Sequence, residues 1–158
     1  MKKKPIAPVL VGRGMAGKAI LRSLDIVSHV DPELDLLPAR IADRGAPLKS
    51  YLAEEAQSVL FLANPSGLHA QSILEGIQAG FTAIAADKPV CVRPQEVSEL
   101  RNTKAFVTIF HGYRAMWGSR TIKRMIEDGA LGEVFAFESR YWQSSGAQTA
   151  LMADPSKE

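Results

Sequence analysis

Short apolar runs alternate along most of the chain with stretches whose apolar residues recur at helical spacing. The apolar runs are typical of buried strands, and they cover residues 6–11, 36–42, 58–63, 82–86 and 106–110. The helical stretches are 15–27, 48–55, 94–100 and 119–128, with a further helix that Ser66 can cap and Gly80 ends. This alternation predicts an α/β fold: a parallel sheet with helices on both of its faces.

The last predicted strand, over residues 134–142, differs from the others in its pattern of apolar residues. Residues 134–142 alternate as a strand does, but they carry apolar side chains on both faces. In the preceding helix we expect Ile122, Met125 and Ile126 to point inward. A strand that is apolar on both faces needs a neighbouring sheet and a covering layer. We therefore expect this strand to begin a second sheet.

Composition narrows the class of protein. The chain has 158 residues, of which 46% are hydrophobic and 23% charged, as in soluble globular domains. Its net charge is only +2, and its basic residues form a run only at Lys2–Lys4. Because proteins that bind nucleic acid usually carry a clustered basic excess, no nucleic-acid partner is predicted. No apolar stretch approaches the roughly 18 residues of a membrane span. The one cysteine, Cys91, allows neither an internal disulfide nor a structural zinc site. We predict no metal site and a cytoplasmic location.

A glycine-rich loop follows the first predicted strand and opens the first predicted helix. Its residues, all candidates for binding a cofactor, are Gly12, Arg13, Gly14, Met15, Ala16 and Gly17. In a G-x-G-x-x-G loop the first glycine permits a tight turn and the second lets the backbone approach a pyrophosphate. The third brings helix and strand close together. The N-terminus of the helix then offers N–H groups to the phosphates.

Two residues after the second predicted strand bear on the choice of cofactor. Asp43 can accept hydrogen bonds from a ribose diol, and its charge disfavours a 2′-phosphate. Arg44 stands beside it and favours that phosphate instead. We therefore predict NAD or NADP as the cofactor, with NAD slightly favoured. An Asp that only forms a turn is the simpler alternative.

The same loop also fits the phosphate-binding motif of nucleoside triphosphatases. Residues 12–18 read G-x-x-x-x-G-K, but that motif continues with a Ser or Thr that binds magnesium. Ala19 stands there and cannot bind a metal ion. This argues against a triphosphatase.

A second motif, Asp87-Lys88-Pro89, ends the fourth predicted strand. Ligands bind at the carboxyl edge of an open α/β sheet. Pro89 favours an extended backbone at Lys88, so the lysine can project beyond the strand and donate to a substrate oxygen or move a proton. A merely solvated lysine is the alternative.

Taken together and in order, the motifs resemble the Gfo/Idh/MocA family, named after glucose–fructose oxidoreductase and inositol dehydrogenase. The resemblance extends from Ile6 to about Trp142 and rests on the glycine loop, Asn64-Pro65, His69, Asp87-Lys88-Pro89, Gly112-Tyr113-Arg114 and the segment 128–143, DGALGEVFAFESRYWQ.

This resemblance implies a Rossmann domain over residues 1–113, followed over 114–158 by the start of a truncated α+β substrate domain. It also implies hydride transfer between nicotinamide and a hydroxyl-bearing carbon of a sugar- or cyclitol-like substrate, in an enzyme that often forms homo-oligomers. Lys88 would be the catalytic residue that bonds the reacting hydroxyl. The other residues that would line the cofactor site are Asn64, Pro65, His69, Asp87, Tyr113 and Arg114.

Two departures from the family pattern matter. Few residues lie between Asp43 and Ser58, so the nucleotide domain is trimmed. The family also continues into most of a second domain, where an Asp and a His complete the acid–base set. None of His29, His69 and His111 matches that His by motif.

These departures keep other functions open. The chain could be the nucleotide-binding half of an oxidoreductase. It could also be a non-catalytic dinucleotide-binding module or sensor subunit. A methyltransferase that uses S-adenosylmethionine shares the glycine loop and the acidic strand end, but nothing in that chemistry calls for Asp87-Lys88-Pro89.

Overall fold

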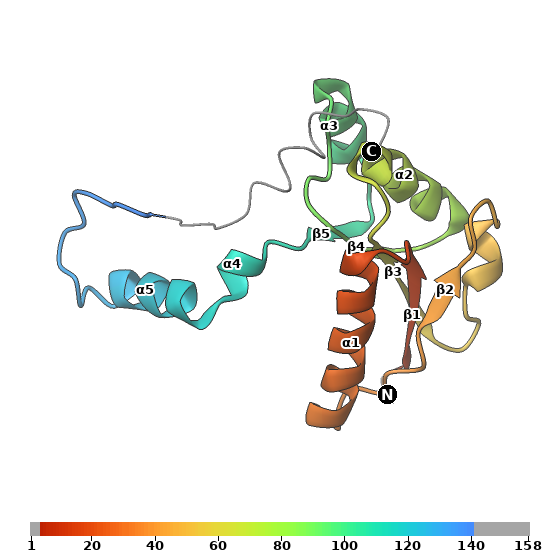
Figure 1. Cartoon of the computed structure of the whole chain (residues 1–158), viewed down its shortest axis with the longest axis horizontal. Helices are drawn as coiled ribbons and strands as arrows, with labels where there is room; N and C mark the ends of the chain where they lie inside the picture. Colours follow the sequence, from red (N-terminus) through yellow and green to blue (C-terminus); the bar gives the residue numbers. More distant parts are fainter. Residues whose placement is uncertain (1–3, 141–158) are drawn as a thin grey trace. The chain divides into compact units, whose positions relative to one another are not determined.

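The computed structural model describes residues 4–140 of the chain (Figure 1). The chain divides into two compact units, with the division after Phe110. The division predicted after Tyr113 lies slightly further along, and the assignment of a substrate domain to the second part stays a prediction.

The first unit is built on one five-stranded sheet in which every pairing is parallel. The strand order is β2-β1-β3-β4-β5. The strands are β1 (Ile6–Val11), β2 (Arg40–Ala42), β3 (Gln57–Leu62), β4 (Ala83–Ala86) and β5 (Phe106–Ile109). All five strands predicted for this unit form. β2 is shorter than predicted because Pro38 lacks a backbone N–H, and Leu36 makes only an isolated bridge to Ile6.

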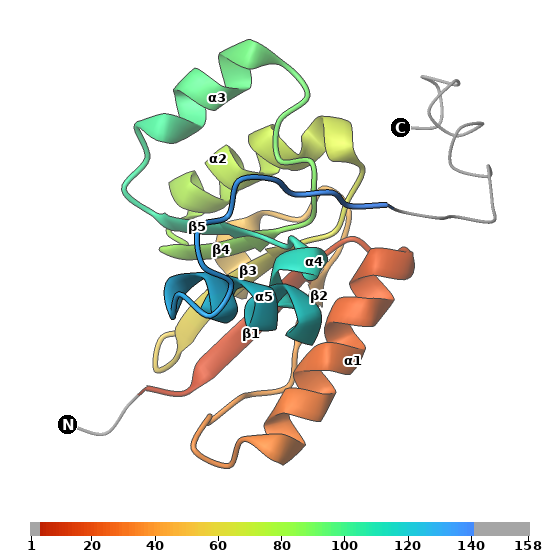
Figure 2. The same ribbon diagram turned by 90° about the vertical axis from the view of Figure 1, so that its left-hand side faces the viewer.

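Helices cover both faces of this sheet, which confirms the predicted doubly wound α/β fold. α1 (Met15–Val30) lies on one face, whereas α2 (His69–Ala79) and α3 (Pro94–Arg101) lie on the other (Figures 1 and 2). The core lies mainly between the sheet and α2. Its fully buried members include Val9, Leu60, Leu62, Ile73, Phe81 and Ile84.

Close packing and a left-handed turn fix the position of α2. A Cβ on Gly76 would lie 2.5 Å from the Leu60 Cδ2 atom, so glycine lets the helix approach β3. Gly80 ends the helix with a φ of 110°, a conformation that glycine adopts without strain. The sequence predicted this stop correctly.

Two local predictions need correction. The helix expected over 48–55 is a single 3-10 turn, η1 (Leu48–Tyr51), because the chain must already enter β3 at Gln57. Ser66 does not cap α2 through its side chain. It begins another 3-10 turn, η2 (Ser66–Leu68), so that Leu68 becomes the N-cap residue of α2.

The second unit contains α4 (Gly112–Ala115) and α5 (Trp117–Glu127). Ile122, Met125 and Ile126 do not point inward as predicted, because they are 45%, 38% and 45% exposed. Residues 134–140 also form no strand. The reason is the same in both cases: the described part of this unit contains no sheet that could pair with or cover them. Tyr141 and Trp142 lie outside the described residues.

Within residues 4–140 no helix combines the length and the apolar character that crossing a membrane requires.

Candidate functional site

The site lies where the strand order reverses. From β1 the chain passes to β2 on one side, and β3 leads to β4 on the other. The crevice outside the carboxyl ends of two such strands is the usual ligand site of an open α/β sheet. Here the loops after β1 and β3 are in direct contact. The Ala63 N–H donates to the Val11 carbonyl at 2.8 Å, and a Cβ on Gly12 would lie 2.3 Å from the Ala63 oxygen.

The loop between β1 and α1 contains three glycines, and the packing of the protein requires two of them. Gly12 has a φ of 104° and lies against the loop after β3. A Cβ on Gly17 would lie 2.3 Å from the Gly12 carbonyl oxygen, so helix and loop need this glycine to pack. Gly14 has an ordinary φ of −68°, and nothing lies within 4 Å of its Cβ position. The protein's own packing therefore does not explain Gly14.

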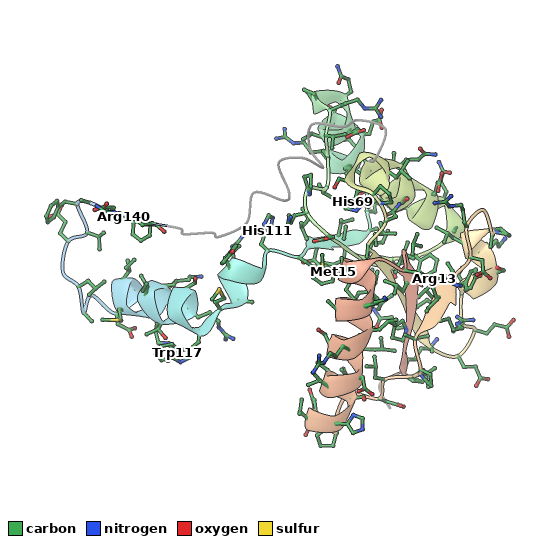
Figure 3. The ribbon with its side chains drawn as sticks, in the orientation of Figure 1. Arg13, Met15, His69, His111, Trp117 and Arg140 are labelled. Carbon is green, nitrogen blue, oxygen red and sulfur yellow. The ribbon has the colours of Figure 1, made fainter. Side chains whose placement is uncertain are left out.

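The start of α1 is suited to an anion. Gly14 is its N-cap, no side chain caps the first turn, and no acidic residue stands in that turn. The first backbone N–H groups therefore have no partner within the helix and carry its partial positive charge. Met15 is exposed and Ala16 is half-buried beside this loop. Figure 3 shows Arg13, Met15 and His69 at the same edge of the sheet. The open space at Gly14 and these N–H groups fit the pyrophosphate of a dinucleotide.

Four charged residues lie on the β2 side of the loop: Arg13, Arg40, Asp43 and Arg44. Arg13 Nη2 lies 2.7 Å from Asp43 Oδ1 and forms an ion pair with it. The backbone N–H of Asp43 donates to the Tyr51 hydroxyl at 3.1 Å, and the Arg40 guanidinium donates to the Tyr51 carbonyl. Arg44 is exposed next to Asp43. η1 thus holds the turn that presents Asp43 and Arg44.

Asn64 and Pro65 follow β3 at the same edge. The Asn64 side-chain amide donates to the Ser72 hydroxyl at 2.9 Å. Its Oδ1 atom is buried and has no hydrogen-bond partner among the described residues. A buried polar atom without a partner costs free energy, so the loop holds this amide in place at some cost in stability.

Lys88 follows β4, and its ammonium group makes no hydrogen bond or ion pair within the described part of the chain. The side chain is exposed. Its backbone is held because the Lys88 N–H donates to Asp87 Oδ1 at 2.8 Å, while the Asp87 N–H donates to the Leu62 carbonyl at 2.9 Å. The Lys88–Pro89 peptide bond is cis. The backbone of Lys88 is thus held in place, while its ammonium group is exposed and can donate hydrogen bonds to a ligand.

His69 joins the loops after β3 and β4. Its side chain is 1% exposed, with Nε2 lying 2.7 Å from the Asn64 carbonyl oxygen and Nδ1 lying 2.7 Å from the Pro89 carbonyl oxygen. Both acceptors are backbone carbonyls. A ring with one N–H donates to one of them, and a ring with two donates to both. The sequence placed His69 beside the cofactor, and direct contact with the cofactor stays a prediction.

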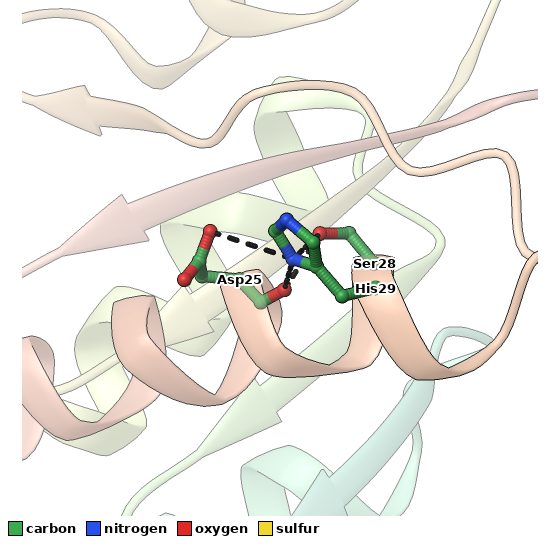
Figure 4. A network of polar contacts seen from close by, with 3 residues as sticks. All are labelled: Asp25, Ser28 and His29. Atoms are coloured by element: carbon green, nitrogen blue, oxygen red, sulfur yellow. Dashed lines mark hydrogen bonds and ion pairs between the residues drawn. The ribbon is translucent and has the colours of Figure 1, made fainter.

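The remaining site candidates belong to other parts of the chain. Tyr113 and Arg114 lie on α4, in the second unit, and their role in cofactor binding stays a prediction. His111 precedes this helix. His29 lies near the end of α1, where its Nδ1 is 2.7 Å from the Asp25 carbonyl oxygen and 3.9 Å from Asp25 Oδ1 (Figure 4). Its contacts are thus local to the helix.

Beside the site, α3 holds a buried carboxylate. The backbone N–H of Val92 and the side chain of Arg93 donate to Glu96, which holds the pKa of its carboxyl below the usual range. Burial, and to a lesser extent the charge of Glu96, raises the pKa of the Cys91 thiol. No group of three or more potential metal ligands gathers anywhere in residues 4–140.

Sequence reasoning missed the contributions of Tyr51 and Ser72, and it did not pair Arg13 with Asp43. No sequence motif points to Tyr51 or Ser72, because each bonds a residue eight positions away across a turn or a helix start that only the fold defines. The ion pair could have been found from the sequence. Residues that follow neighbouring parallel strands lie at one edge, and these two carry opposite charges.

Neither a family model nor a curated protein sequence matches the chain, but solved structures match its fold. Two of them carry provisional oxidoreductase assignments. One is from Klebsiella pneumoniae, with 22% identity, a TM-score of 0.56 and coverage of 82% of this chain and 41% of that one. The other is yvaA from Bacillus subtilis, with 18% identity, a TM-score of 0.62 and coverage of 86% and 47%.

A third is the WlbA (WbpB) dehydrogenase from Thermus thermophilus in complex with NAD and UDP-GlcNAcA. It is 18% identical, with a TM-score of 0.56 and coverage of 78% of this chain and 47% of that one. The chain therefore spans less than half the length of these three proteins. The resemblance inferred from the motifs is confirmed at the level of the fold, which this chain shares with oxidoreductases over part of their length.

Proposed function

We propose that the chain is the dinucleotide-binding part of an NAD(P)-dependent oxidoreductase that acts on a hydroxyl-bearing carbon of a small, sugar- or cyclitol-like molecule. The observation that carries this proposal is the open Cβ position of Gly14 at an uncapped helix N-terminus. The site also lies at the reversal of strand order, where such folds bind nucleotides. The Thermus dehydrogenase with NAD and a UDP-sugar supports the ligand class.

In this proposal each loop has a task. The N–H groups at the start of α1 bind the pyrophosphate, and the turn after β2 receives the adenosine ribose. Asn64 and His69 order the loop after β3. Lys88 donates to the substrate oxygen from its exposed ammonium, while Asp87 holds its backbone. The nicotinamide supplies hydride acceptor or donor chemistry when bound.

A titration of the 158-residue chain with NADH, followed by fluorescence, tests the proposal. We expect saturable binding that an excess of magnesium ATP does not displace. Gly14→Val places a bulky side chain where the phosphates would lie, and it should weaken NADH binding by more than about tenfold, the equivalent of about 1.4 kcal/mol.

The matched control is Ala19→Val, which adds bulk to an exposed position of the same helix. It should bind NADH like the unaltered chain. If the unaltered chain shows no binding at millimolar NADH, the proposal is wrong. If Gly14→Val binds as well as Ala19→Val, the cofactor does not use this loop.

A non-catalytic dinucleotide-binding module is the second candidate. It is favoured by the absence, in the described part of the first unit, of a histidine poised beside Lys88. His69 is engaged by two carbonyl oxygens and His29 bonds within α1. Lys88→Ala separates the two functions. A module keeps both NADH binding and its function in this variant, whereas an oxidoreductase keeps the binding and loses hydride transfer.

A further inference from the structure

The ion pair between Arg13 and Asp43 changes how this site can treat the two nicotinamide cofactors. Val11 of β1 lies opposite Ala42 of β2 in the parallel register, so the residues that follow the two strands meet at one edge of the sheet. There Arg13 Nη2 lies 2.7 Å from Asp43 Oδ1. The acidic residue that would select a ribose diol is therefore already paired with a guanidinium group of the glycine loop.

The backbones of Arg13 and Asp43 are held by neighbouring residues, whereas their side chains are largely exposed to solvent. Gly12 packs against the loop after β3 and sets the start of the Arg13 backbone. The Tyr51 hydroxyl accepts the backbone N–H of Asp43 at 3.1 Å. The two side chains are nevertheless 64% and 71% exposed. Exposed ion pairs of this kind contribute little to stability, so a competing anion can separate the two groups without unfolding their supports.

The positive charges at this edge outnumber the negative charge of Asp43. A lone carboxylate repels a 2′-phosphate, but here Arg13 neutralises the carboxylate and Arg44 adds a further exposed cation. A guanidinium group can donate two parallel hydrogen bonds to the oxygens of a phosphate, in a bidentate arrangement. The second carboxylate oxygen, Asp43 Oδ2, has no hydrogen bond within the described residues and can accept one from a ribose hydroxyl.

We propose that Arg13 determines cofactor specificity by switching partners. With NADH it stays on Asp43 and leaves Oδ2 to the ribose hydroxyls. With NADPH it leaves Asp43 and binds the 2′-phosphate. The unaltered chain then accepts both cofactors with affinities that differ by less than about tenfold. This inference rests on the proposed function, because it requires a dinucleotide at the start of α1.

Parallel titrations of the 158-residue chain with NADH and NADPH test the switch. Arg13→Gln removes the guanidinium charge and retains a polar side chain. Since hydrogen bonds to charged groups are worth about 1.5–3 kcal/mol, this variant should bind NADPH about 10- to 100-fold more weakly. It should bind NADH within about threefold of the unaltered chain, because the ribose hydroxyls use Asp43.

Two further variants complete the design. Arg22→Gln removes an exposed positive charge from the middle of α1, and it is the matched control because Arg22 lies outside the glycine loop and the turn after β2. It should change the ratio of the two affinities by less than about threefold. Asp43→Asn frees Arg13 from its partner and should shift the ratio toward NADPH.

The outcomes separate the switch from the proposed function. If Arg13→Gln binds NADPH as well as the unaltered chain does, or if Arg22→Gln loses as much NADPH affinity as Arg13→Gln, the switch is wrong while the proposed function stands. If the unaltered chain binds NADH and rejects NADPH by far more than tenfold, the switch is also overturned. If it binds neither cofactor, the proposed function fails and the switch falls with it.

Discussion

Replacing the glycines of the loop one at a time should separate those that the fold needs from the one that the ligand needs. At Gly12 an added Cβ would lie 2.3 Å from the Ala63 carbonyl oxygen, 2.5 Å from its carbon and 2.7 Å from the Asn64 nitrogen. All three atoms belong to backbone, so no side chain can move aside. The φ of 104° adds strain for any residue with a Cβ.

The magnitude follows from these two contributions. A left-handed backbone costs about 1–2 kcal/mol for an L-residue, and overpacking at a well-packed contact costs about 1–3 kcal/mol. Gly12→Ala should therefore lower the free energy of unfolding by about 2–5 kcal/mol. For a unit of this size, that corresponds to a melting temperature lower by about 8–20 °C. Gly14→Ala should lower the free energy of unfolding by no more than about 1 kcal/mol, because its Cβ would meet nothing within 4 Å and only the preference of the helix N-cap for glycine over alanine is lost.

Urea unfolding followed by circular dichroism measures both variants against the unaltered chain. The slopes should agree, so that the midpoints alone report stability. Gly17→Ala should resemble Gly12→Ala in direction, since its Cβ would overlap the Gly12 carbonyl oxygen. Equal midpoints for Gly12→Ala and the unaltered chain would refute this reasoning, and so would a loss at Gly14 as large as the loss at Gly12.

Two further variants test the supports of the site. His69→Ala should lower the free energy of unfolding by about 2–4 kcal/mol, since it empties a buried position and removes the ring that lies between the Asn64 and Pro89 carbonyls; an unchanged midpoint in urea would contradict this. Glu96 has a lowered pKa in the folded chain, so its carboxylate stabilises α3 above its unfolded pKa, and this stability is lost as the pH falls through the folded value. Glu96→Gln should therefore be less stable than the unaltered chain at pH 7, and the gap should close in acid; a gap that stays constant below pH 4 would count against it.

The strands and the main helices could be predicted because their signals are local. β1 has the predicted bounds, and Gly80 ends α2 where the sequence indicated. These elements are marked by continuous apolar runs, by helical spacing and by glycine, all of which act within a few residues. The predictions failed where pairing between strands of a sheet decides the outcome. In place of the helix predicted over 48–55 the chain forms only the turn η1, because β3 begins at Gln57. Residues 134–140 form no strand, because the described part of their unit contains no strand to pair with them.

The candidate site divides in the same way. The sequence alone predicted the glycine loop, Asp43 and Lys88 as site residues, because each carries its own chemistry and follows a predictable strand, and their roles stay predictions. Only the tertiary structure decided what these residues contact. It paired Arg13 with Asp43, and it used His69 to join the loops that carry Asn64 and Lys88. The physical reason is range: strand and helix formation depend on near neighbours, whereas ion pairs and buried hydrogen bonds depend on which strands become neighbours in the sheet.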